Sequence, residues 1–197
     1  KCYDKGHFIL LDNSAFEFGY PIEAEELIRM IDESGIKVHC VVAPDYPGQL
    51  SQKTIDSAIS FANKLQELGR SWQIMVVPQS EKGNHVEWLD CYRFFLNDPR
   101  FHIIGMSILG VPNAFCKLTG TEDISINRIF ATSYLLKLYR NRICQVKWHH
   151  YLGLGSNVRE MQIIKNLAEF NQQFGELTND SSSPIWHGYN NIKYDNT

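Results

Sequence analysis

The chain has 197 residues, of which 44% are hydrophobic and 21% are charged, and its formal net charge at pH 7 is −3. These values are ordinary for a globular protein, and the length is sufficient for one domain with a substantial core. The charge excludes a basic field over the whole surface, so a nucleic-acid partner would have to bind a local patch. We therefore expect a single domain over residues 1–197.

The cysteines indicate a reducing compartment, and we expect a cytoplasmic protein. Their number is odd and none forms a CxxC pair, so a disulfide framework is not expected. Cys40 falls within an apolar run, which is typical of an inert buried thiol. The sequence has no run of about 18 apolar residues, so we expect no membrane partner. The five cysteines are Cys2, Cys40, Cys91, Cys116 and Cys144.

Predicted strands and helices alternate along the chain. Short apolar runs predict strands at residues 7–12, 37–44, 72–79, 102–108, 146–152 and 176–180. Amphipathic segments of helical period lie at 21–34, 50–68, 84–96, 126–142 and 158–173. Strict alternation predicts parallel strands joined by crossover helices, in either an open doubly wound sheet or part of a (β/α)8 barrel. The absence of a GxGxxG motif after the first strand disfavours a nucleotide-binding doubly wound sheet.

Polar residues follow nearly every predicted strand. Both architectures gather the carboxyl ends of parallel strands at one rim, so we expect these side chains to lie close together. Carboxylates and an amide can read the edge of a planar heterocycle, an aromatic ring can stack on its face, and a further carboxylate can attack a sugar carbon. In chain order the rim residues are Asp12, Asn13, Asp45, Gln79, Ser80, Ser107, His149, His150 and Asp180, with Phe16 as the stacking ring.

The order of these strand-end motifs resembles the tRNA-guanine transglycosylase superfamily. The motifs are Asp12-Asn13-Ser14-Ala15-Phe16, VVAPD, VVPQS, IGMSILG, HHYLGLG at 149–155 and ELTNDSSSP, and together they span residues 8–190. Within that superfamily, the compact phage-type enzymes that install 7-deazaguanines in DNA are the closest match. A phage-encoded chain would work in the host cytoplasm.

The resemblance implies an α/β fold of the (β/α)8 TIM-barrel type, with the six visible strands standing for strands three to eight. We therefore expect two further βα units before Lys1, in a longer polypeptide or a larger assembly. The CxCxxC zinc motif of the family is absent, so no zinc subdomain, resident metal ion or cofactor is expected. The implied partners are DNA or tRNA, a 7-deazaguanine base, and a second copy or an additional subunit.

The resemblance also implies the roles of individual residues. The implied reaction replaces guanine with a 7-deazaguanine such as preQ0 or preQ1 through a covalent enzyme–sugar intermediate. Asp180 would be the nucleophile at C1′ and Asp12 the general acid and base. The base would be read at its edge by four residues and sandwiched between two others. The edge readers would be Asn13, Asp45, Gln79 and Ser107, and the sandwich would be Phe16 and Leu152.

Cations are concentrated between residues 126 and 165, where Glu160 is the only acid. Aromatic residues are interleaved with them, a pattern typical of surfaces that follow a phosphate backbone. We predict that Arg140, Arg142 and Lys147 contact nucleic acid. The alternative interpretation is an ordinary solvated helix face. The other cations of the segment are Arg128, Lys137, Arg159 and Lys165.

Two other functions remain open. In the first, His149, His150 and His187 hold a metal with Asp12 or Asp45 in a metal-dependent hydrolase. Because strand residues alternate in direction, at most one of His149 and His150 can face the rim. In the second, the chain is a non-catalytic homologue that binds nucleic acid or pairs with a catalytic subunit.

Overall fold

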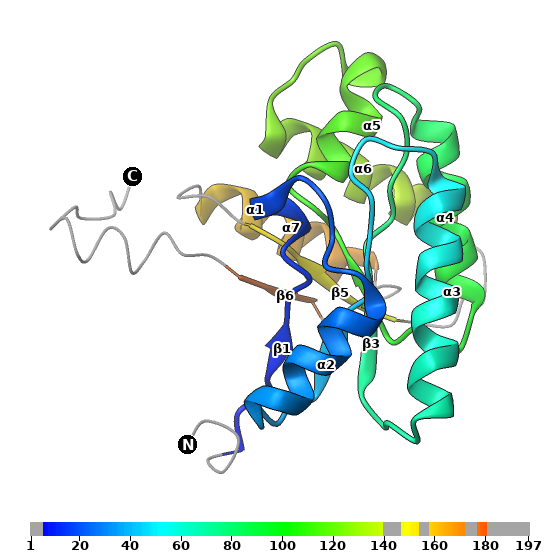
Figure 1. Cartoon of the computed structure of the whole chain (residues 1–197). Coiled ribbons are helices and arrows are strands. Elements are labelled where there is room, and N and C mark those ends of the chain that lie inside the picture. The colour runs from blue at the N-terminus through cyan, green and yellow to red at the C-terminus, as the bar shows by residue number, and fades with distance from the viewer. Residues whose placement is uncertain (1–5, 140–146, 154–157, 172–176, 181–197) are drawn as a thin grey trace, which may run out of the picture.

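The computed structural model describes residues 6–139, 147–153, 158–171 and 177–180. Strands and helices alternate along the chain, with short helices added after β1 and β4 (Figure 1). The strands are β1 (Leu10–Leu11), β2 (Cys40–Val42), β3 (Gln73–Val76), β4 (Ile103–Gly105), β5 (Trp148–Tyr151) and β6 (Leu177–Asn179). The helices are α1 (Ala15–Phe18), α2 (Ala24–Ser34), α3 (Ser51–Glu67), α4 (His85–Asn97), α5 (Gly110–Thr119), α6 (Ile124–Tyr139) and α7 (Val158–Asn171).

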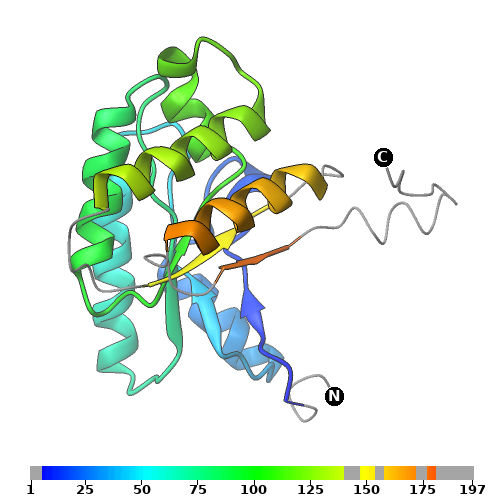
Figure 2. The same cartoon turned by 180° about the vertical axis from the view of Figure 1, so that it is seen from behind.

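Each strand of the sheet is added beside the preceding strand, always on the same side. All its strands are parallel, and they pair in chain order from β1 to β6. Side chains alternate between two faces: Val41 and Ile74 pack in the core shared with the helices, whereas Cys40 and Met75 pack on the other face. The helices therefore cover one face of a curled sheet (Figures 1 and 2).

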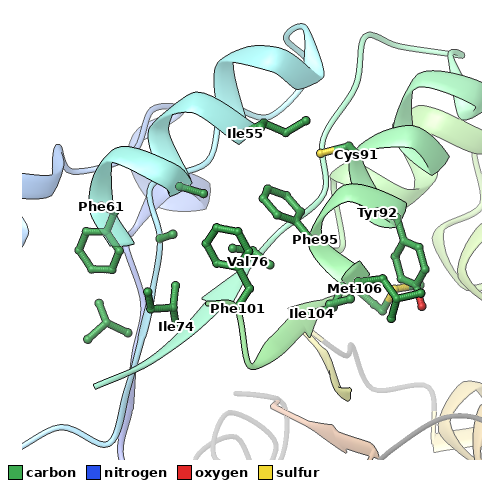
Figure 3. Close-up of a cluster of buried hydrophobic side chains, with 14 of the residues drawn as sticks. Ile55, Phe61, Ile74, Val76, Cys91, Tyr92, Phe95, Phe101, Ile104 and Met106 are labelled. Carbon is green, nitrogen blue, oxygen red and sulfur yellow. The ribbon is translucent and has the colours of Figure 1, made fainter. Parts of the chain in front are cut away.

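Helices α3 and α4 pack against the helix-covered face of the sheet through aromatic and branched side chains. Phe95 of α4 meets Phe101 with ring centroids 5.1 Å apart, next to Val76 of β3 (Figure 3). Phe61 of α3 is fully buried in the same core. Burying such side chains removes large apolar areas from water and supplies most of the driving force for this packing.

The concave face of the sheet is also filled with side chains. Cys40, Met75 and Ile103 are fully buried there, and burial raises the pKa of the Cys40 thiol to about 12. The sequence-based expectation of an inert buried thiol at Cys40 is therefore confirmed. At the amino-terminal end of the strands the rings of Phe8 and Trp148 lie 5.0 Å apart, so the curl brings the start of β1 close to β5.

Gly105 allows the concave face to close at the carboxyl ends of the strands. A Cβ at this position would lie 2.9 Å from Val77 Cγ2 and 3.0 Å from Leu152 Cδ1. The ends of β3, β4 and β5 can therefore meet only because position 105 lacks a side chain.

The expected (β/α)8 barrel is wrong. Such a barrel closes eight strands into a ring, whereas the described residues form an open sheet of six strands with β1 and β6 at its edges. The doubly wound alternative is not found either, because the strand order does not reverse and the helices share one face. The α/β class and the parallel direction of the strands are confirmed.

Arg128 and Glu160 tie α6, α7 and the loop after β5 together. Their side chains are 0% and 2% exposed, and Arg128 Nε donates to Glu160 Oε1 over 2.7 Å. Arg128 Nη1 also donates to the carbonyl of Leu152 over 2.7 Å, and Ser125 Oγ donates to Glu160 Oε2 over 2.9 Å. The buried charges are thus paired and hydrogen-bonded, as burial requires.

We predict that Arg128→Met lowers the free energy of unfolding by about 3–5 kcal/mol, because Glu160 is left buried and unpaired. Arg128→Met combined with Glu160→Leu should recover most of this loss, since no charge is then buried. Urea denaturation of the two variants measures the difference. Equal stability of the single and double variants would contradict the pairing.

Candidate functional site

The loops after β1, β2 and β3 meet at the Asp45 carboxylate. Asn13 Nδ2 donates to Asp45 Oδ1 over 2.7 Å, and Gln79 Nε2 donates to Asp45 Oδ2 over 2.6 Å. Asn13 Nδ2 also donates to the carbonyl of Ala43 over 2.7 Å. Each amide satisfies one carboxylate oxygen, and all three side chains are buried. Three strands that are far apart in sequence thus deliver one hydrogen-bonded cluster.

The environment of Asp45 raises the pKa of its carboxyl to about 6. Burial is the largest cause, because it disfavours the charged form. The donors from Asn13 and Gln79 act in the opposite direction, and the charge of Asp12 adds to the increase. The Asp45 carboxylate is therefore held by two amide donors, in a buried site that disfavours its negative charge.

The start of α5 packs directly against Gln79. A Cβ at Gly110 would lie 2.7 Å from Gln79 Oε1, and Oε1 accepts no hydrogen bond from the residues that the structure describes. Ser107 Oγ accepts from the N–H groups of Leu109 and Gly110, each over 3.1 Å. Ser107 thus fixes the first turn of α5, and the end of β4 joins the Asp45 cluster.

A second carboxylate lies at the ends of β5 and β6. Asp180 Oδ1 accepts from His150 Nε2 over 3.2 Å and from the Gly153 N–H over 3.1 Å. Burial acts to raise the pKa of this carboxyl, but the two donors act against it, and the net pKa lies below the ordinary 3.8. The Asp180 side chain is 55% exposed and that of His150 only 10%. Asp180 is therefore an accessible, ionised carboxylate at neutral pH.

Contacts through the loops after β4 and β5 connect the two carboxylates. Leu152 borders Gly105 at the end of β4, and a Cβ at Gly153 would lie 3.2 Å from Ile108 Cγ2, next to Ser107. Gly153 in turn binds Asp180. The structure thus places Asp45, Gln79, Ser107, Leu152 and Asp180 at the carboxyl ends of the parallel strands.

Asp12 and Phe16 occupy the loop after β1. Asp12 is exposed, and its Oδ1 accepts from the N–H of Asn13 over 2.7 Å. It lies close enough to Asp45 to raise the pKa of that carboxyl. Phe16 is part of α1, and its side chain lies outside what the structure describes. The stacking role of Phe16 therefore stays a prediction.

The positions of Arg128 and Lys147 do not fit a phosphate-binding patch. Arg128 is buried against Glu160. Lys147 is 5% exposed, and its ammonium donates to the carbonyls of Phe95 and Asp98 at the end of α4. This arrangement stabilises the carboxyl end of a helix, and it removes Lys147 from the predicted nucleic-acid contacts. Arg140 and Arg142 lie outside the described residues.

The metal-site alternative gains no support from the described residues, which contain no group of three potential ligands. His149 points away from the rim, toward α4, where its Nε2 lies 2.8 Å from the hydroxyl of Tyr92. Burial lowers the pKa of this imidazole to about 4. The expected opposite directions of His149 and His150 are confirmed. His187 lies outside the described residues.

Sequence reasoning missed Thr178 and Gly153 as members of the site. Thr178 Oγ1 lies 2.8 Å from His150 Nδ1, and Gly153 contributes only its backbone N–H. The pairing of β5 with β6 creates both contacts. The Gly residues of HHYLGLG indicate a tight turn after β5, but no sequence signal gives the partner of its N–H groups.

No family model, curated protein or solved structure matches the chain. Among the described residues, no helix is both long enough and apolar enough to span a membrane.

We predict that Asp45 makes stability depend on pH. Its pKa rises from 3.8 in the unfolded chain to about 6 in the fold, so its ionisation costs the folded state about 3 kcal/mol. That cost is absent below pH 3.8 and complete above pH 6. The unfolding free energy of the wild type, measured against Asp45→Asn, should therefore fall by up to that amount between about pH 4 and pH 7. Parallel urea-denaturation profiles for the two proteins would contradict the assignment.

Proposed function

We propose that the chain is a base-exchange transglycosylase that replaces guanine in a polynucleotide, preferably DNA, with a 7-deazaguanine such as preQ0 or preQ1. The observation that carries this proposal is the hydrogen-bonded Asn13–Asp45–Gln79 cluster on the same sheet edge as a second, ionised carboxylate. One carboxylate would recognise the base, and the other would attack the sugar.

The Asp45 cluster is chemically suited to the edge of guanine. That edge presents N–H donors at N1 and N2 beside the O6 acceptor. A carboxylate offers about four lone-pair positions, and the amides of Asn13 and Gln79 use only two of those on Asp45. In this proposal the remaining lone-pair positions on Asp45 accept hydrogen bonds from the base. A 7-deazaguanine presents the same edge, so one pocket would serve the outgoing and the incoming base.

Asp180 is suited to nucleophilic attack. The donors from His150 and Gly153 both reach Oδ1, and Oδ2 takes part in neither of these bonds. In the proposed first step Oδ2 forms a bond to C1′ while the bond from C1′ to guanine N9 breaks. The electron pair stays on guanine, and Asp12 delivers the proton that the leaving base needs. In the second step the incoming base loses a proton to Asp12 and displaces Asp180 from C1′.

The proposed setting is a reducing cytoplasm. Cys40, Cys91 and Cys116 are free thiols in the structure. DNA and tRNA would both offer the guanine nucleotide, and the described residues give no contact that distinguishes the ribose 2′-hydroxyl.

Incorporation of labelled guanine into DNA and into tRNA tests the proposal. We expect incorporation into at least one polynucleotide, competition by preQ0 or preQ1, and a loss of at least 1,000-fold for Asp180→Asn, which removes the nucleophile. Asp56→Asn is a matched control, because Asp56 is an exposed acid on α3. No incorporation by the wild type into either substrate, with nucleic-acid binding retained, would favour the non-catalytic alternative.

The predicted nucleic-acid patch has its own test. Arg140→Ala combined with Arg142→Ala should weaken binding to the polynucleotide. If each arginine contacts one duplex phosphate, the slope of log affinity against log salt should fall by about 1.8. Lys64→Ala, at a partly exposed lysine of α3, serves as the control. An unchanged salt slope in the double variant would reject the patch.

A further inference from the structure

Asp180 is held by a chain of hydrogen bonds that begins at Trp148. Trp148 Nε1 donates to Thr178 Oγ1 over 2.5 Å, and Thr178 Oγ1 lies 2.8 Å from His150 Nδ1. His150 Nε2 lies 3.2 Å from Asp180 Oδ1. The four side chains come from β5, from β6 and from the residue that follows β6, and none of them contacts the Asp45 cluster in the interactions described above.

The chemistry at the two ends of this chain fixes the direction of its end bonds. The indole N–H of Trp148 can only donate, and the ionised Asp180 carboxylate can only accept. His150 must therefore carry a proton on Nε2. The hydroxyl of Thr178 accepts from Trp148 and can either donate to or accept from His150 Nδ1.

Exposure shows which member of the pair faces the substrate. The Asp180 side chain is 55% exposed, whereas that of His150 is 10% exposed and lies behind it. In a dyad with a catalytic imidazole the reverse order is needed, with the carboxylate behind the ring. Here the imidazole orients the carboxylate.

We propose that His150 is a positioning residue for Asp180. Thr178, which accepts from Trp148, holds the His150 ring through Nδ1. The Nε2–H of that ring, together with the Gly153 N–H, holds Oδ1 so that Oδ2 is presented to the sugar. The inference rests on the proposed function, because it assigns Asp180 the role of nucleophile. It adds the side chains that orient the nucleophile and states that His150 carries a proton on Nε2.

The tautomer can be measured without any reaction. In long-range ¹⁵N–¹H spectra of the wild-type protein at pH 8, the His150 ring should carry a proton on Nε2. His149→Gln assigns the signals by removing the other buried imidazole of β5. A ring without a proton on Nε2 would overturn the proposal, whatever the outcome of the exchange assay.

A series of variants tests the consequence for catalysis. His150→Gln keeps an N–H near the position of Nε2 and should retain kcat within about tenfold. His150→Leu removes the donor and should lower kcat at least 100-fold with little change in the KM for the base, which the Asp45 cluster would bind. Thr178→Val should lower kcat about tenfold, and Thr178→Ser should restore it.

His149→Leu is the matched control, since His149 is the adjacent histidine on the opposite face of β5. It should leave kcat within about threefold in the folded protein, as judged by circular dichroism. If the wild type exchanges guanine and His150→Leu loses no more activity than His149→Leu, the positioning role is wrong and the transglycosylase proposal stands. If the wild type exchanges no guanine, the transglycosylase proposal fails. The measurement of the His150 proton then still decides whether His150 donates to Asp180.

Discussion

The rest of the structure depends on the one-directional winding of a parallel sheet. Each strand is followed by a return over the same face, so all strands end at one edge and the helices gather on one side. The concave side must then be filled by the strands themselves. Gly105 makes this possible, because its missing side chain lets Val77 and Leu152 approach each other. The same close approach joins the loops after β3 and β5 at the rim that carries the polar residues.

The rim holds two carboxylates in opposite environments. Burial raises the pKa of Asp45 to about 6, and two amides hold its oxygens. Asp180 is more exposed, and donors from His150 and Gly153 keep its pKa below the ordinary value. Environments that separate the pKa values of two acids are typical of sites in which the acids have different tasks. The proposed division between base recognition by Asp45 and attack by Asp180 rests on this contrast and does not require a closed barrel.

Much of the fold could be predicted from the sequence, because its strands are short apolar runs and helices such as α2 and α3 have clear amphipathic periods. Helix α5 was missed because it opens with Gly110-Val111-Pro112, which is typical of a turn, although a proline in the first turn costs a helix little. The barrel was wrong because the closed ring of eight strands came from the resemblance, and local patterns do not report closure. Asp45 and Gln79 were predictable as residues that follow buried strands. The burial of Arg128 and Lys147 was not, because a run of cations in sequence does not indicate which of them point inward.

The most direct test of the two-carboxylate rim is to locate the covalent intermediate. The wild-type protein would be incubated with a guanine-containing oligonucleotide, quenched in acid, digested and mapped by mass spectrometry. We expect a sugar-linked oligonucleotide on the peptide containing Asp180, with base release that Asp45→Ala reduces strongly. An adduct on Asp12 or Asp45, or base exchange with no enzyme-linked sugar at any time point, would contradict the assignment.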